Sequence, residues 1–82
     1  MQSPDLKNEI LKEVARKAYE LQIKAGLAQN QKVELSELLA MERAIHHEIK
    51  TLRKLLKRYE KAKKEEERSE LEQRIYFELN WQ

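Results

Sequence analysis

The stretch from Ser36 to Lys63, SELLAMERAIHHEIKTLRKLLKRYEKAK, decides the fold of this chain. Within it, apolar side chains recur at spacings of three and four residues: Leu38, Met41, Ile45, Ile49, Leu52, Leu56 and Tyr59. This spacing is typical of one apolar stripe along an α-helix. No glycine or proline interrupts it, so the pattern predicts a long helix near 35–63, with Ser36 as a possible N-cap.

A first helix is predicted near 4–28. Its apolar stripe has the same spacing: Leu6, Ile10, Val14, Ala18, Leu21, Ala25 and Ala28. The segment 3–5, Ser-Pro-Asp, is a strong helix start, because it combines a capping serine, a proline suited to the first position and an acidic residue at the positive helix end. The polar segment 29–32 predicts a connection, with Gly26 or Asn30 as the left-handed residue that ends the helix.

The end of the chain predicts a third, short helix near 69–80. Residues 61–70 are almost entirely polar, and apolar residues return beyond them at Leu71, Ile75 and Leu79. Extending the earlier stripe at ~100° per residue does not reach these positions. Ser69 with Glu72 also matches a capping box. Both observations favour a break near 64–69, although the helix-forming Lys and Glu residues there also permit one continuous helix.

These elements predict an all-α fold in one domain spanning 1–82: an antiparallel helical hairpin with a short third C-terminal helix. A chain of 82 residues buries only ~60% of its unfolded surface, so its own core is small. There is no cysteine to add a disulfide. The helices therefore form either a three-helix bundle or a bundle shared within a homo-oligomer.

Composition narrows the class of protein. No apolar run approaches the ~20 residues that span a bilayer, and the N-terminus lacks the basic and apolar segments of a secretory signal. We therefore expect a cytoplasmic protein with no membrane partner. Charged residues make up 39% of the chain, a composition typical of long helices or coiled coils.

Charge is segregated along the sequence. The net charge is −1 over residues 1–49, +7 over 50–64 and −4 over 65–82. A nucleic-acid backbone could bind along the basic residues, which are Lys50, Arg53, Lys54, Lys57, Arg58, Lys61 and Lys64. Basic patches alone are a weak motif, however, and a third helix folding back would place the basic and acidic segments face to face.

The sequence gives little support for catalysis or for metal binding. The chain has one glycine, so it has no phosphate-binding loop, and no nucleophile, base and orienting group can be assembled. We expect no enzyme activity, no small-molecule substrate, no cofactor and no metal. Glu42 and His46 have the i, i+4 spacing of two ligands, but further ligands would be needed from another chain. His46 is expected beside the apolar stripe and His47 in solvent.

The apolar residues outnumber what a helical hairpin can cover. A second, thinner apolar line on the first helix adds to three large rings near the chain end, and together they are Tyr19, Ile23, Leu27, Tyr76, Phe77 and Trp81. The rings could close a three-helix core, or they could anchor a partner. The surplus favours a protein–protein interaction module, such as an adaptor, inhibitor or assembly factor, that binds another protein or itself through these residues. Nucleic-acid binding through the basic segment is the alternative function.

Overall fold

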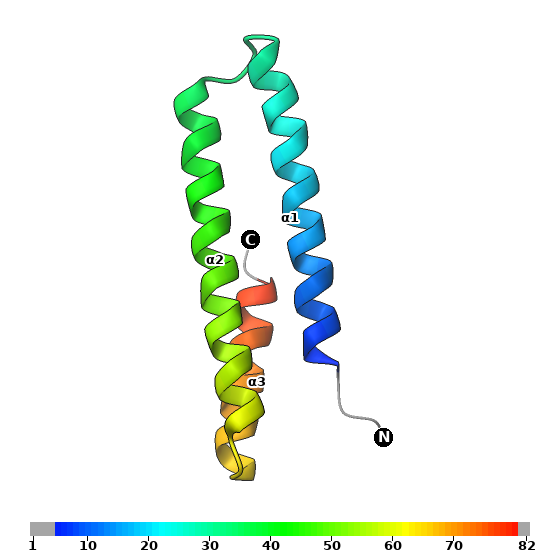
Figure 1. Ribbon diagram of the computed structural model, residues 1–82, viewed down its shortest axis with the longest axis vertical. Helices are drawn as coiled ribbons and strands as arrows, with labels where there is room; N and C mark the ends of the chain where they lie inside the picture. Colours follow the sequence, from blue (N-terminus) through cyan, green and yellow to red (C-terminus); the bar gives the residue numbers. More distant parts are fainter. Residues whose placement is uncertain (1–4, 81–82) are drawn as a thin grey trace.

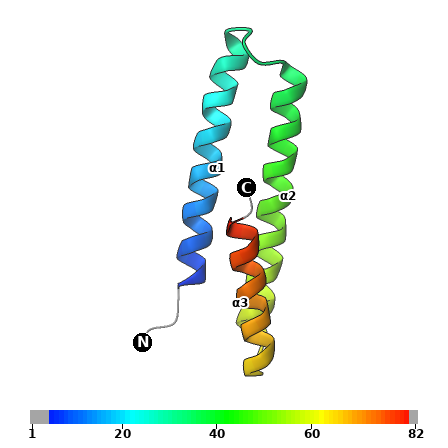
Figure 2. The same ribbon diagram turned by 180° about the vertical axis from the view of Figure 1, so that it is seen from behind.

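The chain forms three α-helices and no strand within residues 5–80, which are the residues that the computed structural model describes. The helices are α1 (Leu6–Gln29), α2 (Leu35–Lys61) and α3 (Glu65–Asn80). Helices α1 and α2 form a long antiparallel hairpin, and α3 folds back along the C-terminal half of α2 (Figures 1 and 2). The predicted all-α hairpin with a third C-terminal helix is confirmed.

Helix α1 begins with a side-chain cap. Asp5 is the N-cap, and its carboxylate accepts a hydrogen bond of 3.1 Å from the backbone N–H of Asn8. This bond satisfies one of the free amides at the helix start and places a negative charge at the positive helix end. The other residues of the predicted start signal, Ser3 and Pro4, lie outside the described residues.

The end of α1 differs from the prediction that Gly26 or Asn30 would be the left-handed residue. The left-handed residue is Gln31, with φ 60°, whereas Gly26 lies inside the helix and Asn30 has φ −91°. The N–H of Lys32 donates to the carbonyl of Leu27 at 2.9 Å, and the N–H of Gln31 donates to the next carbonyl, at 3.1 Å. These two bonds are a Schellman motif. They offset the steric cost that a residue with a Cβ incurs in this conformation.

The break between α2 and α3 is confirmed, but it lies at residues 62–64. Ala62 ends α2 in an extended conformation (ψ 133°), and its buried methyl group joins the core. Helix α3 begins with Glu65, so Ser69 lies inside it and the predicted capping box is wrong. Three consecutive glutamates fill the first turn of α3, where the helix dipole favours negative charge. Ser36 also lies inside its helix, because the N-cap of α2 is Glu34.

Arg68 ties the start of α3 to the end of α2. Its guanidinium donates hydrogen bonds to the carbonyls of Tyr59 (3.3 Å) and Ala62 (3.2 Å). It also lies over the ring of Tyr59, 4.3 Å from the ring centroid. One side chain thus satisfies carbonyls at the negative end of α2 and stacks on an aromatic ring.

The core lies in one half of the molecule. It consists of buried residues from all three helices and from the turn between α2 and α3: Leu6, Ile10, Leu52, Leu55, Ala62, Leu71, Ile75 and Leu79. Helix α3 supplies three of these residues, and it contacts both other helices. Because α3 is short, it reaches only part of the way along the hairpin, and the end of the hairpin near the α1–α2 turn consists of two helices alone (Figure 2).

The basic and acidic segments are less directly paired than the charge pattern suggested. Helix α3 runs back along α2, as expected, but no ion pair joins residues 50–64 to residues 65–79 within the described side chains. The reason is the helical phase of the cations. Lys50, Lys54, Lys57 and Lys61 lie on the side of α2 opposite its buried residues, and all four are exposed.

Candidate interaction surface

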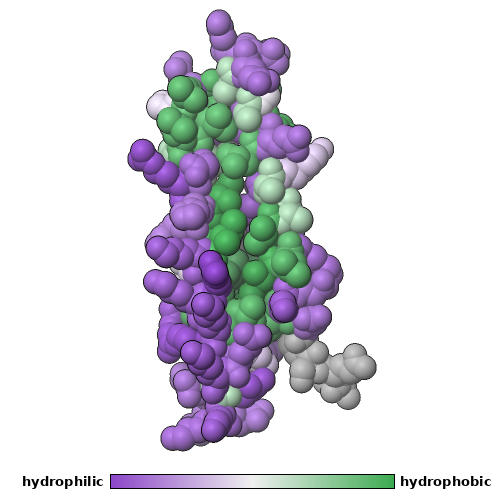
Figure 3. Space-filling model, viewed as in Figure 1, coloured by the Kyte–Doolittle hydropathy of each residue, from purple (hydrophilic) through white to green (hydrophobic). Residues whose placement is uncertain are grey.

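An apolar band lies on the face of the hairpin opposite α3. Figure 3 shows it as a strip of apolar side chains that follows the junction of α1 and α2. Three large exposed residues belong to this side: Leu11, Leu35 and Leu39, with exposed fractions of 59%, 64% and 47%. We define the apolar band by these three residues and by the partly buried Ile49 and Leu56.

Helical geometry places these residues on that side. Leu55 is buried in the core shared with α3, and Leu35 and Leu39 lie about 160° around α2 from it, at ~100° per residue. On α1, Leu11 lies about 140° from Leu6, which is also in that core. Both helices therefore present apolar side chains on the side that α3 leaves uncovered.

The predicted contact residues occupy separate regions. Tyr19 and Ile23 are exposed and lie about 160° on either side of Leu21, so they project from the outer side of α1, away from α2, with Leu27 on the same flank. Tyr76 is half-buried against the core, and Phe77 is exposed. Trp81 lies outside the described residues. The structure thus brings Tyr19, Ile23 and Leu27 together but separates them from Tyr76 and Phe77.

Sequence reasoning missed the exposed leucines of the apolar band, whereas Ile49 and Leu56 belong to the stripe predicted for α2. The signal was present on α2, because Leu35 and Leu39 are four residues apart, about one helical turn. This pair lies beside the stronger stripe through Leu52 and belongs to the same helix. The sequence pattern does not show which flank of α2 a third helix covers and which flank stays exposed to water.

The basic residues form one exposed face of α2. Lys50, Arg53, Lys54, Lys57, Arg58 and Lys61 are all exposed on this helix, and Lys64 lies in the turn that follows it. None of them has an ion-pair partner among residues 5–79. The structure therefore collects the cations of the predicted nucleic-acid segment on the solvent side of a single helix.

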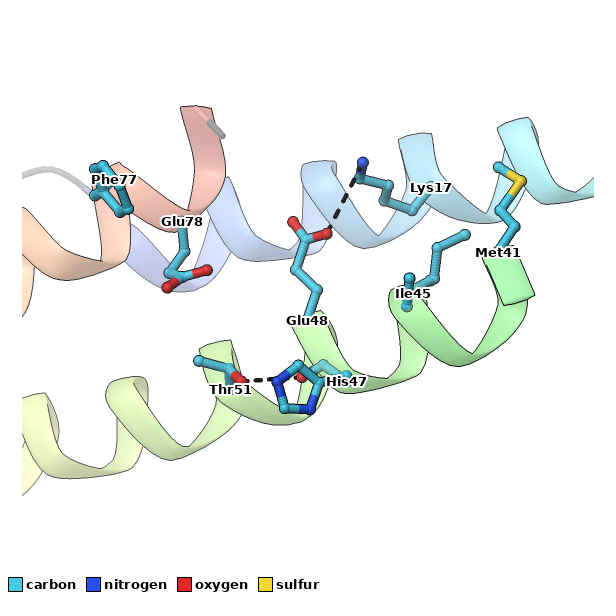
Figure 4. Close-up of a pocket in the computed structure, with 9 residues that line it drawn as sticks. Lys17, Met41, Ile45, His47, Glu48, Thr51, Phe77 and Glu78 are labelled. Atoms are coloured by element: carbon cyan, nitrogen blue, oxygen red, sulfur yellow. Dashed lines mark hydrogen bonds and ion pairs between the residues drawn. The ribbon is translucent and has the colours of Figure 1, made fainter. Parts of the chain in front are cut away.

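A pocket of about 490 Å³ opens beside the C-terminal part of α3. Figure 4 shows it between α3 and the facing sides of α1 and α2. Its lining residues are Lys17, Met41, Ala44, Ile45, His47, Glu48, Thr51, Phe77 and Glu78. The hydroxyl of Thr51 donates a hydrogen bond to the carbonyl of His47 (3.0 Å), an ordinary bond within a helix. Its proton is therefore not available to a ligand in the pocket.

Glu48 is a carboxylate in an unfavourable environment in this pocket. One of its oxygens lies 3.8 Å from the ammonium of Lys17, and the other is buried without a hydrogen-bond partner. Burial raises the pKa of Glu48, Lys17 lowers it, and the carboxylates of Glu13 and Glu78 add to the rise. The charged form of Glu48 is therefore less stable in the folded chain than in water.

Replacing Glu48 with glutamine is expected to stabilise the fold at neutral pH. Since the folded pKa lies above the unfolded value, ionisation of Glu48 destabilises the native state as pH rises through the folded pKa. The gain should disappear below the unfolded pKa, where both forms are neutral. Thermal unfolding over a pH series measures it, and Glu60→Gln, at an exposed position of α2, is the control. A gain that does not vary with pH would contradict this account of Glu48.

The remaining chemistry is sparse within the described part of the chain. No group of three or more His, Cys, Asp or Glu residues that could hold a metal ion occurs among these residues, and Glu42 and His46 lie exposed on α2. None of the helices within residues 5–80 combines the length and the apolar content that a membrane span requires.

Comparison with known proteins gives no relative. No protein-family model, no curated protein and no solved structure matches this chain.

Proposed function

We propose that this chain is a protein–protein interaction module, of the adaptor, inhibitor or assembly-factor kind, that acts by covering a surface of its partner. The observation that carries the proposal is the apolar band, where Leu11, Leu35 and Leu39 remain exposed on the side of the hairpin that α3 leaves uncovered. Single exposed apolar residues are common on protein surfaces, but a contiguous apolar face of this kind is typical of an interaction site. We expect a cytoplasmic location for such a module.

The hairpin suits this role. Apolar side chains on two packed helices are held in place before binding, so little conformational entropy is lost when a partner docks. Polar and charged residues flank the band on both sides (Figure 3), as they do around the centre of a protein interface. Burial of the band is expected to supply most of the binding energy, and the flanking charges to guide the approach.

Site-specific photo-crosslinking tests this proposal. A photo-reactive amino acid replaces one residue at a time in cells that express the chain. At Leu39 we expect covalent adducts with protein. At Ile23, which is exposed on the outer side of α1, we expect far fewer, because that side lies outside the band. Adducts from Ile23 alone would overturn the band as the contact surface and favour the residues predicted from sequence. An absence of protein adducts from both positions would contradict the function itself.

Nucleic-acid binding is the second candidate, and the exposed cations of α2 favour it. The same experiment decides between the two functions with a third position. A photo-reactive residue at Lys54, on the basic face, should then give adducts with nucleic acid that disappear as salt is raised. If Leu39 gives adducts with protein and Lys54 gives no adduct with nucleic acid, the basic face contributes solubility and charge steering only.

A further inference from the structure

The two helices of the hairpin each present a seam of regularly spaced residues on the face of the apolar band. The spacing alternates between four and three residues, as along the contact line of a coiled coil. On α1 the seam consists of Leu11, Ala15, Ala18, Gln22 and Ala25. On α2 it consists of Leu35, Leu39, Glu42, His46, Ile49, Arg53 and Leu56. All of these residues are exposed or half-buried, and Leu56 also packs against the core. The exposed parts of both seams are free to pack against something else.

The midpoints of the two seams lie at the same level of the hairpin. The ion pair between Lys17 and Glu48 joins α1 to α2 at 3.8 Å, which sets Ala18 beside the turn of α2 that contains His46. Ala18 is the central residue of its seam, and His46 is the central residue of the other. A twofold axis through this level, perpendicular to the helices, pairs each seam with its own copy in the antiparallel direction.

The charges in the α2 seam select this direction. Glu42 lies on one side of His46 and Arg53 on the other. An antiparallel second copy brings Glu42 within about one helical turn of Arg53 in that copy, and opposite charges meet. If α2 of the second copy ran parallel to α2 of the first and in register with it, each charge would face the same charge in the other copy. The pattern extends along the whole helix, since residues 34–48 carry four Glu and one Arg, and residues 50–61 carry six Lys or Arg and one Glu.

The available area fits a reversible dimer. At 1.5 Å per residue the seams are about 21 Å and 32 Å long, and two helices side by side are about 20 Å wide. This corresponds to roughly 500–600 Å² per copy, near the lower limit of about 1,200 Å² in total for specific interfaces. Small residues along the α1 seam allow the helices to approach closely, while the leucines of α2 supply the apolar contact.

We propose that a second copy of this chain occupies the apolar band, in an antiparallel arrangement in which His46 of one copy meets His46 of the other and Glu42 pairs with Arg53. The result is a four-helix bundle of two hairpins, with the α3 helices on its two outer faces. This inference rests on the proposed interaction function and names its partner.

Single cysteines test the arrangement directly, because the native chain has none. Under mild oxidation, His46→Cys should form a disulfide-linked dimer, since the two positions meet at the twofold axis. Leu39→Cys should not, because its two copies would lie about 21 Å apart, whereas disulfides require Cα atoms within ~7 Å. Cross-linking of both variants would indicate a parallel pair and overturn the proposal. Cross-linking of neither would also overturn it.

Sedimentation of the native chain over a concentration series gives the second measurement. The mass should rise with concentration from 9.9 kDa toward twice that value. Arg53→Glu should weaken the dimer at least several-fold, and the double variant Glu42→Arg/Arg53→Glu should restore it, because both pairs are then reversed. A native chain that stays at 9.9 kDa while Leu39 gives adducts with a different protein overturns the dimer and keeps the proposed function. A monomer without any adduct overturns both.

Discussion

Replacing Ile75 with alanine is expected to lower the free energy of unfolding by about 2–5 kcal/mol, since it removes buried methyl and methylene groups and leaves a cavity. Ile75 is fully buried, with an exposed fraction of 0%, and it packs where α3 meets the other two helices. A chain of 82 residues has a total stability of roughly 4–12 kcal/mol, so this single change removes a large share of it.

The matched control is Ile23→Ala. It makes the same chemical change on an α-helix, but Ile23 has an exposed fraction of 49% and lies outside the core. We expect it to cost less than about 1 kcal/mol. Urea unfolding at one fixed protein concentration compares the two variants, because self-association would otherwise shift the apparent stability. Equal losses for Ile75 and Ile23 would mean that α3 does not pack on the hairpin.

Replacing Arg68 with alanine is expected to lower the free energy of unfolding by about 1–2 kcal/mol. The change removes two hydrogen bonds to the carbonyls at the end of α2 and the stacking on Tyr59. A lysine at this position can replace the charge but not both fixed bonds and the planar stacking. Arg68→Lys should therefore recover only part of the loss.

Arg74→Ala is the control for Arg68. Arg74 lies on the same helix, is exposed and has no ion-pair partner among the described residues. Its replacement is expected to change stability by no more than about 0.5 kcal/mol. If Arg68→Ala and Arg74→Ala have the same small effect in chemical unfolding, the connection between α2 and α3 does not depend on the guanidinium.

Both predictions concern α3, because its position determines which surface remains for binding. Its three buried residues, Leu71, Ile75 and Leu79, cover one side of the hairpin. The opposite side then retains the apolar band with Arg53, and the outer side of α2 retains the exposed lysines. A variant that detaches α3 would expose a second apolar face on the hairpin and thereby a second surface for binding.

The ends of the helices show where local sequence signals compete. Ser69 and Glu72 form an acceptable capping box, yet α3 begins at Glu65, because the glutamates before Ser69 are strong helix formers at the favourable end of the dipole. Gly26 is the best left-handed residue in its region, yet it stays in α1, and Gln31 takes that conformation. Helix termini depend on hydrogen bonds to specific carbonyls, which sequence spacing does not reveal.

By itself, the sequence determined the helical character of the chain and the apolar face of α2, and it favoured, without deciding, a break before the third helix. These features follow from the 3.6-residue period and from polar interruptions, which act over one or two turns. Only the tertiary structure decided which flank of the hairpin α3 covers, and hence that Leu11, Leu35 and Leu39 stay exposed while Tyr76 is partly buried. Two apolar flanks of one helix have the same local pattern, and the choice between them depends on the turn at residues 62–64 and on the total surface buried by packing.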